Sequence, residues 1–390
     1  MYRLFFSIAL IAATAAFGSA QDLGSSNKLF GGKDSSKKSA PAAKTAAPRN
    51  SAARPSRSKR TTARRASRTA SPNAASTAVK KVPDTKKVSP AAKLSSEQIA
   101  KLTSEAAAAL KVGDLASAEE KYREVVKSST DDSSAKLALG RILVIPVPVM
   151  DLADRYEEAM NLAKTVSEKE PANAAAFELL GVAREMLGLV GPETEAAYRT
   201  AIRLSPERAA TYAYLARLLR RNGNISGAAE MDAAAATRAD KAAEVAEIAE
   251  ILQSEQRFPA AERLLKTAVR NEPNHPLVLN LLGRSQLANG EVADAIASLK
   301  ASLGVDLSNF DTYFRLASAY LRSSDLANAE NTLLRGSRFA HKYDKPVLAR
   351  QFEQLGDAYS KAGKQEEARR SYKLALTYQP ERETVIAKLK

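Results

Sequence analysis

From Ser96 to the end of the chain, alanine and leucine recur every three or four residues, and polar residues fill the positions between them. This spacing predicts amphipathic helices. Short turns such as Gly113-Asp114 and Gly223-Asn224 break the pattern after every dozen residues or so. Glycine is typical of helix ends, so each turn predicts the boundary between two helices. We therefore expect residues 96–390 to be all-helical and built of antiparallel hairpins.

The same pattern returns at a fixed period, which is the sequence signature of stacked repeats. Its clearest copy has seven marked positions at gaps of 3, 4, 5, 4, 3 and 5 residues, namely Gly356, Tyr359, Gly363, Ala368, Tyr372, Ala375 and Pro380. Looser copies begin at Pro276 and Phe310, which are 34 residues apart. Further copies begin near Ala174, Ala209 and Ala242, and a first full copy is marked by Ala106, Gly113, Ala118 and Tyr122. Eight copies cover the chain from Ile99 to Pro380.

This order of small, aromatic and glycine residues resembles the tetratricopeptide repeat, over nearly three-quarters of the chain. The resemblance implies a right-handed superhelical solenoid of about eight antiparallel helix hairpins. One hairpin cannot cover its own apolar face, so neighbouring copies share a continuous core. The repeated residues are therefore scaffold. We expect the charged residues 381–390 to form a capping helix at the end of the array.

Two segments depart from the repeat. Residues 145–151 lengthen the second copy by seven residues, and Pro146 and Pro148 forbid a regular helix there. This apolar loop is either a contact site for a partner or, as we favour, a segment whose Val147, Val149 and Met150 fold back onto the neighbouring hairpin. Residues 342–348, between the last two copies, look like a helix extension or a hinge.

The resemblance also implies where a partner binds. In this family the inner face of the superhelix is lined by five positions of each first helix. Here these positions include Arg141, Arg217, Arg220, Arg221, Asn280, Arg284, Leu287, Phe314, Leu321 and Arg322. Arginines at the equivalent position of three copies favour a groove for an acidic or carboxylate-bearing peptide. Val182, Glu250, Ser318 and Asp357 interrupt that row, and an ordinary solvated helix face is the alternative.

The amino terminus has the three parts of a secretory signal peptide, residues 1–20. Arg3 precedes an uncharged, largely apolar run of 14 residues, Leu4 to Phe17, and Gly18-Ser19-Ala20 provides small residues for cleavage. A bilayer needs about 20 apolar residues. We therefore expect a cleaved signal and a periplasmic or secreted protein, with an uncleaved membrane anchor as the alternative.

Residues 21–95 form a tail rich in Ala, Ser, Pro, Lys and Arg. Between residues 21 and 93 there are 18 Lys and Arg against three Asp, a net charge of +15, whereas residues from Ser96 onward have 40 basic and 41 acidic side chains. The whole excess of the chain therefore belongs to the tail. Its composition predicts disorder. It serves either as a spacer or as an electrostatic contact with an anionic envelope polymer or lipid surface.

No catalytic, metal or cofactor site is expected. The chain has no cysteine and two isolated histidines, which excludes thiolate and paired-histidine chemistry, and no phosphate loop or nucleotide fingerprint is present. Nucleic acid is a poor partner because no aromatic residue lies between Phe30 and the repeats. We expect an exported, non-catalytic scaffold that binds another protein in its groove. The alternative is a binder of anionic polymer through the tail, with the repeats as an oligomerisation platform.

Overall fold

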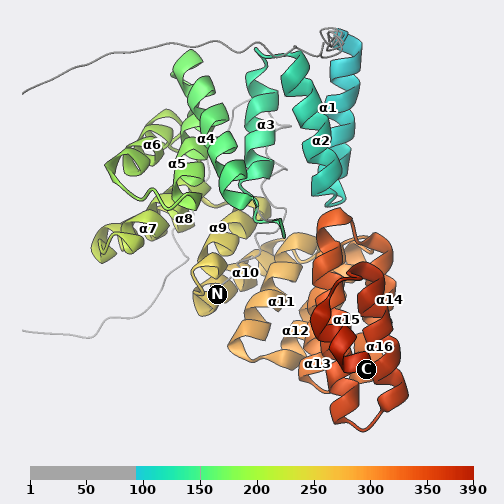
Figure 1. Cartoon of the computed structure of the whole chain (residues 1–390). Coiled ribbons are helices and arrows are strands. Elements are labelled where there is room, and N and C mark those ends of the chain that lie inside the picture. Colours follow the sequence, from blue (N-terminus) through green and yellow to red (C-terminus); the bar gives the residue numbers. More distant parts are fainter. Residues whose placement is uncertain (1–93, 150) are drawn as a thin grey trace, which may run out of the picture. The chain divides into compact units, whose positions relative to one another are not determined.

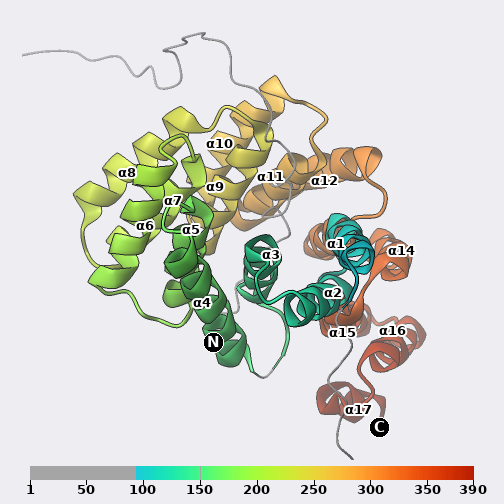
Figure 2. The ribbon, with the colours of Figure 1, turned by 90° about the horizontal axis from the view of Figure 1, so that it is seen from above.

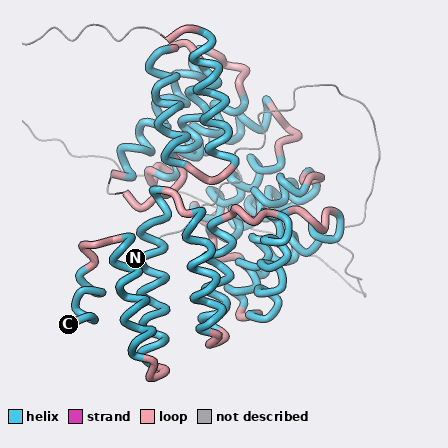
Figure 3. The backbone as a smooth tube through the Cα atoms, turned by 90° about the vertical axis from the view of Figure 1, so that its right-hand side faces the viewer, coloured by secondary structure: helices cyan, strands magenta, loops and turns pink. Residues whose placement is uncertain are grey.

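The computed structural model describes residues 94–149 and 151–390. Within these ranges the chain forms seventeen α-helices and no strand, which confirms the all-helical prediction. Short loops join the helices in series (Figure 3). The predicted signal peptide, and the tail as far as residue 93, lie outside the described residues.

Sixteen of the helices pair into the eight expected hairpins, and α17 (Glu383–Leu389) follows the last of them (Figures 1 and 2). The pairs are α1 (Ser96–Lys111) with α2 (Leu115–Ser128), α3 (Ser133–Leu143) with α4 (Leu152–Lys169), α5 (Ala174–Met186) with α6 (Pro192–Leu204), α7 (Ala209–Arg221) with α8 (Ile225–Arg238), α9 (Ala242–Ser254) with α10 (Phe258–Asn271), α11 (Pro276–Asn289) with α12 (Val292–Val305), α13 (Phe310–Arg322) with α14 (Leu326–Gly336), and α15 (Lys345–Lys361) with α16 (Gln365–Tyr378). Two short 3-10 turns, η2 (Ser337–Phe339) and η3 (Lys342–Asp344), precede α15.

The turns inside the hairpins follow local rules. The expected glycines adopt positive φ, for example +88° at Gly290, a conformation that glycine accepts without strain. The residue that follows often caps the next helix, as Asp114 does by accepting a hydrogen bond from the Ser117 amide at 3.1 Å. The fifth and seventh copies lack the glycine, and there Gln256 and Ser324 take φ values of +61° and +60° instead. The packing of the repeat therefore imposes the turn even on unsuitable residues.

Small residues let the two helices of a hairpin approach closely. A Cβ added to Gly181 would lie 2.6 Å from the Tyr198 ring, and one added to Gly356 would lie 2.5 Å from the Tyr372 ring. In both hairpins the nearest neighbour of that added atom is the aromatic side chain of the second helix.

We predict that Gly356→Ala lowers the free energy of unfolding by about 1–3 kcal/mol, because the added methyl group overpacks the contact with Tyr372. Gly304→Ala is the matched control. It lies in α12, where an added Cβ meets nothing within 4 Å, so the gain in helix propensity should raise stability by up to about 1 kcal/mol. Urea denaturation of both variants measures the difference. Equal effects would contradict the proposed close packing.

The buried side chains form three successive apolar clusters that follow the array. The first joins copies one to three, the second runs through copies three to six, and the third joins copies six to eight. Each cluster is shared between neighbouring copies, as the repeat predicts. The array curves, and the first hairpin, α1 and α2, lies next to the last two copies in both ribbon views (Figures 1 and 2).

Both departures from the repeat have a definite structure. Val147 is buried and Val149 partly buried against the cluster of the first three copies, which is the fold-back that we favoured. Met150 lies outside the described residues. Residues 342–348 form η3 and the first turn of α15, and Pro346 stands at the start of that helix, where its missing N–H is tolerated.

Candidate functional site

The first helices of the copies contact one another along the array, from α3 through α5, α7, α9, α11 and α13 to α15. Their exposed edge is the inner face on which we expected a partner. The structure places most of the predicted arginines of this face against carboxylates of the chain itself.

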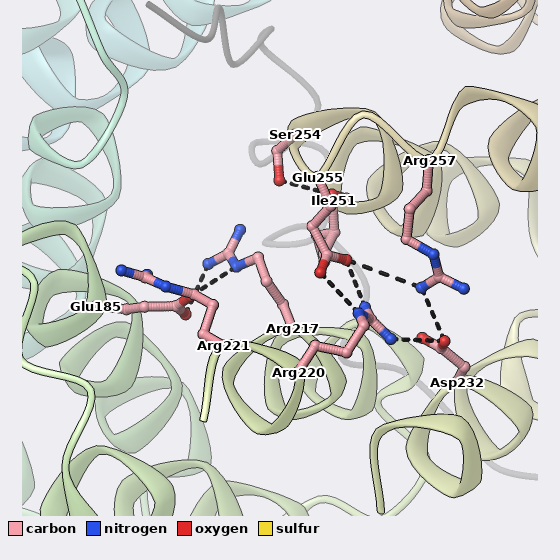
Figure 4. Close-up of polar contacts among 9 residues, drawn as sticks. All are labelled: Glu185, Arg217, Arg220, Arg221, Asp232, Ile251, Ser254, Glu255 and Arg257. Atoms are coloured by element: carbon pink, nitrogen blue, oxygen red, sulfur yellow. Dashed lines mark hydrogen bonds and ion pairs between the residues drawn. The ribbon is translucent and has the colours of Figure 1, made fainter. Parts of the chain in front are cut away.

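Glu185 is the centre of the first group (Figure 4). Its side chain is fully buried, and it accepts hydrogen bonds from Arg217 at 2.9 Å, from Arg221 at 3.0 Å and from the Tyr198 hydroxyl at 3.0 Å. Burial opposes the charge, yet the two guanidinium groups hold the pKa of Glu185 below its usual value. Arg217 is itself 4% exposed. This ion pair is therefore part of the scaffold between α5 and α7.

Arg220 belongs to a second group, also drawn in Figure 4. It donates to Asp232 on α8 at 2.7 Å and forms two hydrogen bonds with Glu255, in the turn before α10. Arg257 donates to the same Asp232 carboxylate at 2.8 Å. Two arginines and two carboxylates thus neutralise each other across two copies.

Arg141 approaches a third group. Glu178 receives two hydrogen bonds from Arg208, which also donates to Glu247 at 2.8 and 3.0 Å. Arg141 lies 4.0 Å from Glu178. Burial opposes charge on both carboxyls. Arg208 and Arg141 nevertheless hold the pKa of Glu178 below its usual value, whereas burial raises the pKa of Glu247.

Asn280 and Arg284 lie on α11, the first helix of the sixth copy. The Asn280 amide donates to the Thr312 hydroxyl at 2.8 Å, but its Oδ1 atom has no hydrogen-bond partner among the described residues. The same is true of Oε1 of Glu250, which is 6% exposed. Burial raises the pKa of Glu250 well above its usual value. Burial, with the neighbouring Arg315, lowers the pKa of Arg284 to about 10.

The remaining predicted residues lie on copies six to eight. Leu287 is buried, and its carbonyl accepts a hydrogen bond from Arg322. Phe314 lines a different cavity, near the start of α13. Leu321 and Arg322 line a surface depression of about 400 Å³ together with Ser318, Gln351, Gln354 and Ala358. Oε1 of Gln351 is buried there without a hydrogen-bond partner among the described residues.

The carboxylates of this face were not among the residues predicted from the sequence. Glu178 and Glu185 lie at inner-face positions of the third copy, by the same numbering of the repeat that gave the arginines. The sequence therefore contained the signal for these carboxylates as well. Gln351 and Gln354 lie outside the five family positions. No sequence signal pointed to them.

The hairpin geometry and the spacing of the copies agree with a known family. One model of the tetratricopeptide repeat matches residues 247–306 and again residues 280–344, and a second matches residues 352–382. Residues 247–344 and 352–382 of the chain are tetratricopeptide repeats. The matched segments follow the hairpins from α9 to α16, while the earlier copies are looser in sequence. A comparison with curated proteins finds no significant match.

Solved structures show likeness in fold. Yeast Tom70 is similar over 78% of this chain and 66% of its own, with 13% identity and a TM-score of 0.54. A repeat-containing protein from Cytophaga hutchinsonii is similar over 65% of this chain and 99% of its own, with 18% identity and a TM-score of 0.42. A chain of the Cut9–Hcn1 assembly is similar over 74% of this chain, with 12% identity and a TM-score of 0.42. The present chain spans only about half (54%) of the length of that relative.

The described residues contain neither a membrane-spanning helix nor a metal-binding cluster. No helix in residues 94–149 and 151–390 is long and apolar enough to cross a bilayer. In the same ranges, no group of three His, Cys, Asp or Glu side chains is arranged to hold a metal ion.

Proposed function

We propose that this protein is a non-catalytic tetratricopeptide repeat scaffold that binds a segment of another protein on the inner face of its last two copies. The observation that carries this proposal is the depression between α13 and α15. It combines an apolar side chain, Leu321, an exposed cation, Arg322, and the amide side chains of Gln351 and Gln354. An apolar residue beside a cation and amides suits a peptide segment that carries both an apolar side chain and polar groups.

The internal ion pairs change which arginines we expect an acidic partner to contact. Arg217 and Arg220 are held by carboxylates of the chain, and a peptide carboxylate would have to displace them. Arg322 is exposed at the rim of the depression. A partner with a carboxylate beside an apolar residue therefore suits Arg322 and Leu321 better than the arginines of α7.

We also propose that the protein is exported and that its tail gives the array reach or weak attachment to an anionic envelope component. The signal-like residues 1–20 and the net charge of +15 between residues 21 and 93 support this. The same charge favours one alternative, in which the tail binds the anionic polymer and the repeats are a platform for oligomerisation.

A crosslinking pull-down from the envelope fraction of the source organism tests these proposals. Baits of residues 21–390 and 96–390 should capture the same discrete protein. Leu321→Glu should reduce that capture about tenfold, as expected for a central contact. Leu334→Glu, at an exposed leucine of the outer helix α14, is the matched control and should leave capture unchanged. Capture by the longer bait alone, lost in high salt, would instead assign the function to the tail.

A further inference from the structure

The two longest departures from the repeat lie together in the structure, although one belongs to the second copy and the other precedes the last. A cavity of about 120 Å³ has both in its walls, Pro146 and Val147 from one and Tyr343 and Asp344 from the other. The α1–α2 turn and the start of α13 complete it. Copies of a solenoid ordinarily contact only their neighbours, so this is an additional contact between the two ends of the array.

Tyr343 is the principal residue of this contact. Its hydroxyl donates to the Glu119 carboxylate of α2 at 3.1 Å, across 224 residues of sequence. Glu119 also pairs with Arg155 of α4 at 2.5 Å, and the Arg155 guanidinium lies 5.9 Å from the centre of the Tyr343 ring. The side chains of both charged residues are 10% exposed or less. The Tyr343 ring packs against the apolar cluster of the first three copies rather than that of its own copies.

A second polar contact lies beside the first. Nδ1 of His341 lies 3.5 Å from the Asp114 carboxylate. Asp114 caps α2, so its position is fixed by the first hairpin. The Asp344 carboxylate accepts a hydrogen bond from the His341 backbone N–H at 2.8 Å, which fixes the position of His341. His341 and Tyr343, at the start of η3, thus contact the carboxylates of Asp114 and Glu119 in the first hairpin.

From this geometry we propose that residues 145–148 and 341–348 form a latch, which holds the first two copies against the last two, and whose release opens the array. The latch consists of one hydrogen bond, one close polar pair, one cation–π contact and one small apolar contact. The interfaces between neighbouring copies are instead continuous along whole helices. The latch is therefore the weakest interface of the array, and it opens while the stacked hairpins remain folded.

Distances between two spin labels on the full-length chain test the latch. The chain has no cysteine, so Glu120→Cys on α2 and Arg338→Cys on η2, both at exposed positions, give one unique labelled pair. We expect a narrow distance distribution in this parent. Tyr343→Ala should move it to longer, broader distances. Tyr343→Phe, which removes only the hydroxyl, should raise the ratio of open to closed molecules about tenfold.

Tyr359→Phe is the matched control. The Tyr359 hydroxyl donates to Glu330 at 2.7 Å, so this variant also removes a tyrosine–glutamate hydrogen bond, but one between neighbouring copies. It should leave the distance distribution unchanged. Circular dichroism establishes that each variant keeps its helices. If Tyr343→Ala unfolds the chain, the distance distribution of Tyr343→Phe alone tests the latch. A broad distribution in the parent, no response to Tyr343→Phe, or an equal response to Tyr359→Phe would overturn the latch.

Discussion

Replacing Glu185 by alanine is expected to lower the free energy of unfolding by about 3–5 kcal/mol, the usual effect of breaking a buried ion pair. Glu185 is fully buried and receives hydrogen bonds from Arg217, Arg221 and Tyr198. Its removal leaves the charge of Arg217 in a desolvated position without its carboxylate. Urea denaturation followed by circular dichroism measures the change.

A neighbouring pair of the same residue types is the control. Glu193 and Arg184 lie 3.2 Å apart, but the Glu193 side chain is 74% exposed. Glu193→Ala should therefore change stability by about 0–1 kcal/mol. A similar loss of unfolding free energy in both variants would mean that burial does not increase the contribution of the Glu185 ion pairs to stability. The row of inner-face arginines would then have to be explained by binding rather than by stability.

The second large effect concerns pH. Burial raises the pKa of Asp344 to about 6, with Asp311 and Asp114 adding to the rise and His341 opposing it. Because the folded-state pKa lies above the usual value, the folded protein binds this proton more tightly than the unfolded chain does. The stabilisation is complete below the usual pKa of about 4 and is lost as the pH rises through about 6. Asp344→Asn should therefore be more stable than the parent at pH 7.5, by about 2–3 kcal/mol, and equal to it near pH 4.

Denaturation of parent and variant at both pH values checks this difference. The groups around Asp344 are known, namely His341 beside it, Asp311 on α13 and Asp114 at the α1–α2 turn, and they are the same in both proteins. Asp325→Asn is the control, because the pKa of Asp325 is shifted in the opposite direction. Hydrogen bonds from Asn328 lower the pKa of Asp325 at the start of α14, so its stabilisation is present at neutral pH and is lost as the pH falls. A pH-independent difference for Asp344→Asn would contradict its burial as a charged group.

The repeat itself was readable from the sequence because its determinants are local. Glycine at the turn and a small residue beside an aromatic one recur every 34 residues or so, and both act within one hairpin. The spacing of the repeat even indicated the ion pair of Glu185 with Arg217, because these residues lie 32 positions apart, close to one repeat period. We read the arginines as a binding groove because their carboxylate partners were not placed in the same register.

Two features of the structure, the contact between Tyr343 and Glu119 and the depression beside Gln351, could not be predicted from the sequence. Nothing local links Tyr343 to Glu119, because their contact depends on the accumulated rotation of every copy between them. The depression beside Gln351 likewise depends on how two neighbouring first helices splay apart. Small angular differences between copies decide both, and a pattern of residue types does not specify angles to that precision.

The hydrogen bond between Tyr343 and Glu119 also bears on how the protein unfolds. In an open row of repeats the terminal copies have a single neighbour, so they fray first and the rest follow inward. Here α17 covers one end, and the first hairpin has gained a second neighbour from the far end of the row. Loss of the first hairpin therefore requires the loss of contacts on two sides. While the latch is closed, the first hairpin is therefore held on both sides, and it becomes a starting point for unfolding only after the latch has opened.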